Sequence, residues 1–258
     1  MFMRSMIIDY HSHILPGIDD GSSCIDESVT LLRMLCEQNV GTVIATPHFN
    51  ANRTNLKNFL SERDAAFNEL RETLKNMQDV PLVIKGAEIR YYPGISRLKE
   101  LDELRIGDTQ LLLLEMPFEK WSEYAIEELL QIGCRGEYKV IIAHIERYFS
   151  YFRGTSFWEG LSENGILLQS NATFFANRKT RHKAVKLFKS GLIDVIGSDC
   201  HNIDERPPMI SDARDIIESK LGTDIWHRYE KYSNSILKDN IIFEEPVQYY
   251  ENTDSVRR

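Results

Sequence analysis

Short apolar runs alternate with longer amphipathic segments along the whole chain. Between the runs, apolar residues recur at three- and four-residue steps, which is the spacing of one face of a helix. The segment 55–77 is the longest predicted helix. Seven runs have the length and composition of buried strands, and they lie at 7–13, 43–47, 82–87, 111–114, 140–143, 166–171 and 194–198. This alternation is typical of a parallel α/β fold.

Four further helices are predicted between these strands. One follows the polar loop at 19–23 and reaches about Gln38, and the others lie near 123–134, 178–189 and 209–220. Neither a linker nor a low-complexity segment interrupts the pattern. We therefore expect one domain over residues 1–243 and a polar tail over residues 244–258.

Six of the seven apolar runs end at a histidine, glutamate or aspartate. The first run ends at His11 and His13, which point to one side of a strand because side chains alternate. The other run ends supply His48, Glu88, Glu115, His144, Asp199 and His201. Parallel α/β folds carry their active sites at the C-terminal ends of the strands. These side chains are thus expected to meet in one cluster.

The residue types in this cluster favour a hydrolytic metal site. Imidazole and carboxylate without thiolate suit manganese, iron or zinc better than a closed structural zinc site. With Asp20 from the first loop there are nine candidate ligands. That is too many for one ion and indicates two or three, with a glutamate between two of them. Clustered ions produce hydroxide near neutral pH and stabilise both oxygens of an in-line displacement, which favours phosphoester hydrolysis.

Each of these residues has a simpler interpretation when it is taken alone. A histidine or aspartate at a strand end often caps a helix or makes a hydrogen bond, and Asp20 could be a helix-capping residue. The metal hypothesis depends on the whole set following apolar runs. His182 and His227 lack this context and are interpreted as surface or packing residues.

Composition excludes several other classes of function. The net charge of −8 argues against a nucleic-acid surface, which would be basic. No apolar run approaches the roughly 20 residues of a membrane span, and Met1–Met6 lack the apolar stretch of a signal peptide. The cysteines have no CxxC spacing and are expected to be free thiols in the cytoplasm; they are Cys24, Cys36, Cys134 and Cys200.

Several short motifs together resemble one bacterial family. They are HSHILPGIDDG at 11–21, ATPH at 45–48, GAEIR at 86–90, AHIERY at 143–148, SDCH at 198–201, RPP at 206–208 and NSIL at 234–237. In this order they resemble the capsule-associated, manganese-dependent protein-tyrosine phosphatases of the polymerase-and-histidinol-phosphatase (PHP) superfamily. The chain departs from the family at Ile145, where proline is usual, and at Cys200, where alanine is common. Neither departure removes a ligand.

The resemblance implies a single-domain, distorted TIM-like (β/α)7 barrel with the metal site at the C-terminal ends of its strands. Manganese is the implied metal, with iron or zinc as alternatives. Arg147 and Arg206 correspond to residues that bind the phosphoryl group, although either could form only a surface ion pair. The implied ligands are His11, His13, Glu88 and Asp199 for the first ion, Glu88, Glu115 and His144 for the second, and Asp20, His48 and His201 for the third.

The resemblance also implies a reaction and a partner. The expected reaction is hydrolysis of phosphotyrosine on a protein, namely the tyrosine-rich tail of an autophosphorylating kinase that controls capsule or exopolysaccharide synthesis. The first alternative is a small-molecule phosphatase of the same superfamily, similar to histidinol-phosphate phosphatases. The second is a metal-bound pseudoenzyme that only docks the kinase. Neither nucleic acid nor membrane insertion is expected.

Two further features have competing interpretations. Cys200 and Arg206 have the Cys-x5-Arg spacing of thiol-based tyrosine phosphatases. The intervening residues contain no glycine and two acids, which would repel phosphate and raise the pKa of the thiol, so we reject that mechanism. Tyr249 and Tyr250 could themselves be phosphorylated, but an ordinary polar tail is the favoured interpretation.

Overall fold

The computed structural model describes residues 7–134 and 137–242 of the chain. Its strands are β1 (Ile7–Ser12), β2 (Val40–Ala45), β3 (His48–Phe49), β4 (Leu82–Lys85), β5 (Glu88–Arg90), β6 (Leu111–Glu115), β7 (Lys139–Ile142), β8 (Leu167–Asn171) and β9 (Val195–Gly197). Its α-helices are α1 (Ile25–Glu37), α2 (Leu56–Leu74), α3 (Glu123–Cys134), α4 (Ser156–Glu163), α5 (Ala172–Ala176), α6 (Arg181–Lys189), α7 (Ile210–Leu221) and α8 (Thr223–Asp239). Three 3₁₀ turns lie at Ile95–Arg97, Leu101–Leu104 and Ile145–Tyr148.

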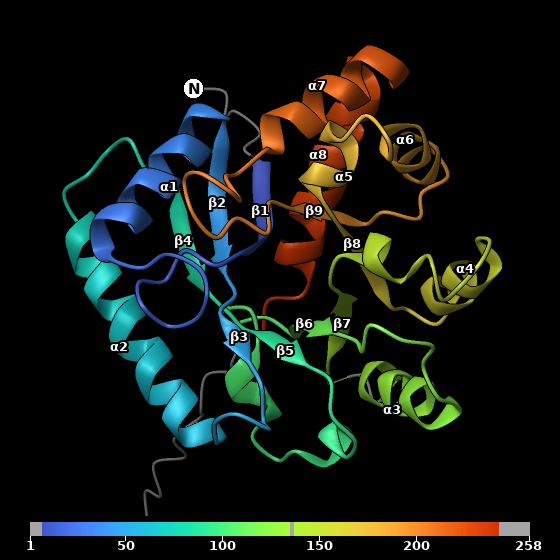
Figure 1. Cartoon of the computed structure of the whole chain (residues 1–258), viewed down its shortest axis with the longest axis horizontal. Helices are drawn as coiled ribbons and strands as arrows, with labels where there is room; N and C mark the ends of the chain where they lie inside the picture. The colour runs from blue at the N-terminus through green and yellow to red at the C-terminus, as the bar shows by residue number, and fades with distance from the viewer. Residues whose placement is uncertain (1–6, 135–136, 243–258) are drawn as a thin grey trace, which may run out of the picture.

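The strands form two parallel sheets in the centre of the molecule. One has the order β1-β2-β4 and the other the order β3-β5-β6-β7-β8-β9. A parallel bridge between Ser12 and Cys200 joins the end of β1 to the segment after β9. Helices surround the strands in Figure 1, with α1 and α2 on the side of β2 and β4, and α3 to α8 on the other sides. Because all pairings between these nine strands of the described residues are parallel, their C-terminal ends lie on the same side of the sheets.

Two of the apolar runs are interrupted just before a candidate ligand. Thr46 and Pro47 separate β2 from β3, and proline cannot donate to a sheet ladder. Gly86 and Ala87 separate β4 from β5. Pairing nevertheless continues across both breaks, because the Glu88 amide donates to the Pro47 carbonyl at 3.0 Å. The breaks therefore redirect the last residues of each run without separating the strands.

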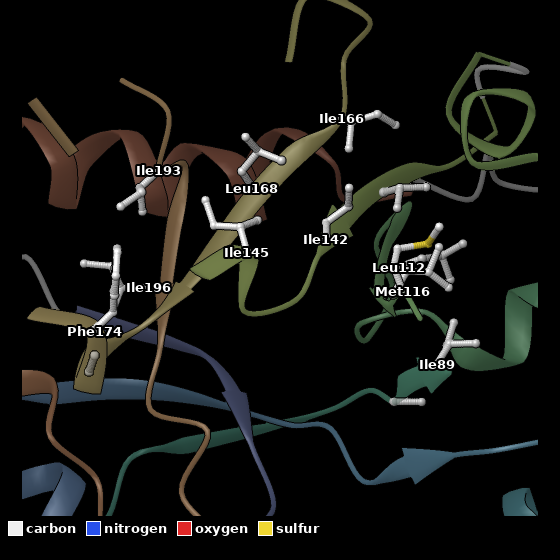
Figure 2. Packing of buried hydrophobic residues seen from close by; sticks show 14 of the residues in the cluster. Ile89, Leu112, Met116, Ile142, Ile145, Ile166, Leu168, Phe174, Ile193 and Ile196 are labelled. Atoms are coloured by element: carbon white, nitrogen blue, oxygen red, sulfur yellow. The ribbon is translucent and has the colours of Figure 1, made fainter. Parts of the chain in front are cut away.

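Alternating residues of the strands pack into two hydrophobic clusters. In β6, Leu112 and Leu114 belong to the larger cluster with the helices, whereas Leu111 and Leu113 belong to the smaller one. Figure 2 shows labelled residues of the larger cluster along the strands and the segments that follow them. Glu115 is two residues beyond Leu113 and so continues the series of the smaller cluster. Burial of each aliphatic side chain stabilises the fold by about 1.5–3 kcal/mol, which keeps the strand ends fixed.

The sequence prediction of the elements is largely confirmed. All seven apolar runs contain strands, and the five predicted helices correspond to α1, α2, α3, α6 and α7. Asn55 caps α2 by accepting a hydrogen bond from the Asn58 amide at 2.9 Å. The prediction missed α4, α5 and α8. The proposed tail at 244–258, including Tyr249 and Tyr250, and the start at Met1–Met6 lie outside the described residues.

None of the helices within 7–134 and 137–242 is both long and apolar enough to cross a bilayer.

Candidate active site

The end of β1 brings two histidines together at the centre of the molecule. His11 and His13 are both fully buried, and their Nε2 atoms are 3.1 Å apart. Glu88 Oε2 lies 3.2 Å from His11 Nε2 and 3.4 Å from His13 Nε2. Asp199 Oδ1 lies 3.6 and 3.4 Å from the same two nitrogens. Four side chains predicted to share one ion therefore converge on one point.

Glu88 stands between this group and a second one. Its Oε1 atom lies 2.9 Å from His144 Nε2, while its Oε2 atom faces His11 and His13. Glu115 Oε1 lies 3.5 Å from the same His144 nitrogen. The two oxygens of one buried carboxylate thus face two different histidine groups. This is the geometry expected of a bridging ligand.

The third predicted group lies nearer to solvent. His48 Nε2 and His201 Nε2 are 3.4 and 3.7 Å from Asp20 Oδ1. The Asp20 side chain is 69% exposed and that of His48 is 33% exposed. His48 Nδ1 also lies 2.8 Å from Glu88 Oε2, which connects this group to the buried one. All nine candidate ligands therefore belong to one continuous cluster.

The donor atoms of this cluster fit divalent metal ions. Within the described part of the chain, Glu88 Oε2 and His201 Nε2 are buried and make no hydrogen bond of regular geometry, although histidine nitrogens lie within 3.4 Å of Glu88 Oε2. A buried polar atom without a partner usually costs about 1–3 kcal/mol, so it calls for an explanation. Ligand atoms within 4.8 Å of one another occur in four overlapping sets, which include His11–His13–Glu88 and His48–Glu88–Glu115. A group of ions with imidazole and carboxylate ligands would satisfy these atoms.

Backbone strain coincides with two of the candidate ligands. His144 and Asp199 have φ angles of 35° and 53°, in the left-handed region that non-glycine residues rarely adopt. Such conformations cost about 1–3 kcal/mol and are retained where the surroundings enforce them, often at functional sites. Both residues directly follow an apolar run. The strained turn directs each side chain into the cluster.

Two glycines allow the backbone to approach the first histidines closely. A Cβ atom on Gly197 would lie 2.5 Å from His11 Cβ, and one on Gly21 would lie 2.2 Å from the His13 carbonyl oxygen. Gly21 belongs to the loop that carries Asp20. Its small size lets this loop fold back over β1, where the Ser22 amide donates to the His13 carbonyl at 2.9 Å.

Several polar residues that the sequence interpretation missed hold the histidines in place. Asp19 Oδ2 accepts a hydrogen bond from His13 Nδ1 at 2.8 Å. Gln169 Oε1 lies 3.3 Å from His11 Nδ1 and accepts from the His144 amide at 2.6 Å. Partners of this kind orient metal-binding histidines and raise their basicity. Asp19 directly precedes Asp20, but only the structure shows which of the two faces His13.

The carboxylates and histidines of the cluster shift the pKa of one another. Burial would raise the pKa of Glu88, but the neighbouring His11, His13 and His144 outweigh it and hold the pKa well below its usual range. Burial would lower the pKa of His144, but Glu115 and Glu88 raise it to about 9. Burial would also lower the pKa of His48, but the hydrogen bond and negative charge of Glu88 outweigh burial and raise it. Without metal, His48 and His144 are therefore favoured in the protonated form beside ionised Glu88, whereas burial and the charge of His13 lower the pKa of His201 to about 4.

The two arginines predicted to bind phosphate lie beside Asp199. Arg147 and Arg206 donate to Asp199 Oδ2 at 2.5 and 2.8 Å, and Asn171 Nδ2 donates to the same oxygen at 2.7 Å. Asp199 thus presents one oxygen to the histidines and the other to the arginines. Both guanidinium groups are more than a third exposed and line a cavity of about 540 Å³ together with Glu88.

An exposed aromatic residue, also missed from sequence, lies next to this cavity. Phe118 is 41% exposed although it is apolar, and it stacks on the buried Tyr148 at 5.7 Å between ring centroids. Its ring lies 5.8 Å from the Arg147 guanidinium carbon and 5.8 Å from the His144 ring. Phe118 follows the candidate ligand Glu115 by three residues, and this position in the sequence could have indicated that it lies near the site. This ring offers apolar surface beside the arginines.

The structure supports the rejection of a thiol mechanism. Cys200 is fully buried, and burial raises the pKa of its thiol to about 12. In the segment that follows, the amides of Asp204, Glu205 and Arg206 all donate to Asn202 Oδ1. These amides therefore do not form a phosphate cradle. Cys200 has neither the thiolate nor the anion site that such chemistry requires.

Comparison with known proteins places this architecture in one family. The profile described as "Capsular polysaccharide synthesis, CpsB/CapC" matches residues 7–238. The chain belongs to this family.

Characterised relatives cover almost the whole chain. It is 30% identical over 247 residues to the tyrosine-protein phosphatase YwqE of Bacillus subtilis, which covers 94% of this chain and 96% of that protein. It is 31% identical over 231 residues to the tyrosine-protein phosphatase CpsB of Streptococcus pneumoniae, and this alignment covers 84% of this chain and 91% of CpsB.

A solved structure supports the same conclusion. The chain superposes with a TM-score of 0.81 and 27% identity on a structure from the work on YwqE of Bacillus subtilis and CpsB of Streptococcus pneumoniae, which are described there as unique metal-dependent tyrosine phosphatases. The superposition covers 93% of this chain and 98% of that chain. A lactonase from Listeria monocytogenes at 8% identity and a TM-score of 0.57 shares the fold alone.

Proposed function

We propose that this chain is a metal-dependent protein-tyrosine phosphatase that hydrolyses phosphotyrosine monoesters. The observation that carries the proposal is the buried Glu88 carboxylate, with His144 at one oxygen and His11 and His13 at the other. Relatives named tyrosine-protein phosphatases, aligned over nearly the whole chain, support it. The link to capsular polysaccharide synthesis follows from the family description.

The nine candidate ligands would hold two or three ions in the groups that the family resemblance implies. Bound divalent ions would supply hydroxide near neutral pH and offset charge on the phosphoryl oxygens. The donor set of imidazole and carboxylate without thiolate suits manganese, iron or zinc, and we propose manganese because the family resemblance implies it. Asp19 and Gln169 would keep His13 and His11 in their orientations.

The arginines and the aromatic ring would bind the substrate. Arg147 and Arg206 would hold two phosphoryl oxygens by charge-assisted hydrogen bonds and exchange their contact with Asp199 for the phosphoryl group. Phe118 would pack against the phenol ring of the phosphotyrosine side chain. Asp199 would keep both guanidinium groups in position before the substrate enters.

Several finer conclusions belong to the same proposal. We infer that the two sheets are one (β/α)7 barrel of the PHP type, in which β2–β3 and β4–β5 are single interrupted strands and the Ser12–Cys200 bridge closes the ring. We infer a single catalytic domain over residues 1–243, a cytoplasmic location, and a phosphorylated tyrosine kinase of capsule or exopolysaccharide synthesis as the substrate protein.

The proposal is tested by matched substrates with and without a chelator. Purified protein is assayed on a phosphotyrosine peptide, on the same peptide carrying phosphoserine, and on histidinol phosphate. Preferred hydrolysis of phosphotyrosine that stops with chelator and returns with Mn²⁺ supports the proposal. Preferred hydrolysis of histidinol phosphate would replace it with the small-molecule alternative. Absence of turnover in every metal-loaded assay would favour a docking protein.

A further inference from the structure

Two further arginines that line the cavity take no part in the arrangement described above. Arg53 and Arg90 line the same cavity as Glu88 and Arg147, and both are exposed. Arg53 lies in the turn before α2, and Arg90 is the last residue of β5. Among the described residues, neither guanidinium group forms an ion pair within 4.0 Å or a hydrogen bond. Arg147 and Arg206, by contrast, are both paired with Asp199.

The position of Arg90 follows from the geometry of its strand. Side chains two residues apart in a strand point to the same side, so Arg90 lies on the side of Glu88. Its Cα is about 6.6 Å further along β5, at the C-terminal end of the strand. Its register partner on β6 is Glu115. Arg90 thus lies one step beyond Glu88 along β5 and level with Glu115 on β6, on the wall of the cavity.

The charge of the cavity favours an anion at this position. Most carboxylates that line it are candidate metal ligands or orient one, and bound divalent ions would neutralise their charge. Glu62 on α2 is the exception, and neither Arg53 nor Arg90 lies within 4.0 Å of its carboxylate among the described residues. Two exposed guanidinium groups then remain on the cavity wall without an anionic partner among the described residues. Arginine presents a planar fork that pairs well with carboxylates.

We propose that Arg53 and Arg90 form a subsite for an acidic side chain of the substrate protein, next to the phosphotyrosine in its sequence. This inference rests on the proposed function, because the phosphotyrosine side chain must occupy the inner cavity. The peptide backbone then lies at the mouth, and a neighbouring aspartate or glutamate reaches the two arginines. The enzyme therefore selects phosphotyrosines in acidic segments.

The test compares two peptides that differ only in charge. Each carries one phosphotyrosine, flanked by aspartates in one peptide and by asparagines in the other. The measured quantity is the ratio of kcat/KM for the acidic peptide to that for the neutral peptide. An exposed charge pair typically contributes up to about 1 kcal/mol, so each arginine is expected to raise this ratio by up to roughly five-fold, mainly through KM.

Substitutions of the two arginines test whether they cause the preference for the acidic peptide. Arg53→Gln and Arg90→Gln should each lower the ratio, and the double variant should bring it close to one. Arg71→Gln is the matched control, because Arg71 is an exposed arginine on α2 outside the cavity lining. It should keep the wild-type ratio. Metal analysis of each variant detects indirect damage to the ligands next to Arg90.

Two measurements on the wild-type protein keep the inference falsifiable if a variant fails to fold. Added salt should lower the ratio, because it screens exposed charge pairs. A third peptide with a second phosphoryl group in place of the aspartates tests for a phosphate site, and selection of this peptide alone would overturn the carboxylate assignment. Equal hydrolysis of the acidic and neutral peptides would overturn the inference but leave the phosphatase function intact. Hydrolysis of no peptide would overturn both.

Discussion

The floor and the rim of the cavity are built in different ways. The floor consists of Glu88, which lines the cavity, and of the strand-end histidines in contact with it, and all are at most 1% exposed; the histidines are His11, His13 and His144. The rim consists of four side chains that are 33–69% exposed, namely Asp20, His48, Arg147 and Arg206, and all of them except His48 come from loops or turns. Packed strands fix the floor, whereas loops and paired charges hold the rim.

This difference predicts how each part responds to change. A buried charge that loses its partner keeps its full desolvation penalty, and its interactions with nearby charges are strong. An exposed charge is screened by water and salt, and water can replace a lost contact. Substitutions in the floor should therefore abolish the site, and substitutions on the rim should tune it.

The largest effect is expected for Glu88→Gln on the floor. The amide keeps the shape but cannot serve as a charged ligand between two ions. Changes to residues that only support a metal ligand typically cost about 10–100-fold, so loss of this ligand should lower turnover by more than about 100-fold and reduce the bound metal. Glu62→Gln, an exposed glutamate that lines the same cavity, is the control. Turnover of Glu88→Gln near that of the control would refute the bridging role.

A smaller effect is expected for Arg206→Ala on the rim. Charge-assisted hydrogen bonds contribute about 1.5–3 kcal/mol, so kcat/KM should fall roughly ten- to a hundred-fold with unchanged metal content. Arg206→Lys should recover part of the loss, because lysine restores the charge but not the planar fork. Steady-state kinetics on a phosphotyrosine peptide provides the measurement. If Arg206→Ala kept the wild-type kcat/KM, Arg206 would not bind the phosphoryl group and would only form the ion pair with Asp199.

Protons should compete with metal at the floor. The raised pKa of His144, about 9 against an ordinary 6.5, means that protonated His144 stabilises the metal-free fold fully below about pH 6.5. This stabilisation is lost as the pH rises through about 9. Metal binding requires the neutral ring, so it has the opposite pH dependence. From about pH 6.5 to about pH 8.5, apparent Mn²⁺ affinity should rise, by up to about ten-fold per pH unit for each proton displaced.

This pH dependence is measured by titrating Mn²⁺ into metal-free protein and by following its melting temperature over the same range. The melting temperature of the metal-free protein should fall as the affinity rises. Affinity that is constant with pH would mean that His144 is neutral without metal.

A weaker effect is expected at the aromatic edge of the rim. Aromatic pairs contribute about 0.5–1.5 kcal/mol, so Phe118→Ala should lower kcat/KM for a phosphotyrosine peptide by about two- to ten-fold. For the same peptide with phosphoserine, the kcat/KM of Phe118→Ala should stay close to that of the wild type, since phosphoserine has no ring for Phe118 to contact. Tyr151→Ala, another exposed aromatic residue, is the control. An equal decrease in kcat/KM for both peptides would show that Phe118 does not contact the phenol ring of the substrate.

The smallest effect is expected for Cys200→Ala. The thiol is fully buried, and the amides that follow it are engaged by Asn202, so turnover should stay within about three-fold of wild type. Loss of activity with metal still bound would instead indicate thiol chemistry.

The floor could be predicted from the sequence and much of the rim could not. His11, His13 and Glu88 follow apolar runs, and strand period and parallel packing then require them to meet. The positions of Asp20 and Arg206 depended on the family resemblance, because loop conformation has no such period. Asp19 and Gln169 were missed because nothing local distinguishes an orienting residue from other polar residues.

The fold shows the same division. The apolar runs gave the strands, since burial on both faces leaves a continuous hydrophobic signal. α8 was missed although Trp226, Tyr229 and Ile236 lie on one face, because the remaining residues are mostly polar. The breaks before His48 and Glu88 were also missed, since they depend on pairing between distant segments.

The central claim is that phosphotyrosine hydrolysis depends on metal held at the Glu88 floor. The most direct measurement follows metal content and phosphotyrosine-peptide turnover together while Mn²⁺ is returned to chelator-treated protein. The account predicts that wild-type turnover rises in proportion to bound metal and saturates at two or three ions per chain. Glu88→Gln should bind fewer ions and remain inactive at the same Mn²⁺ concentrations. Full turnover by wild-type protein that holds almost no metal would contradict the account.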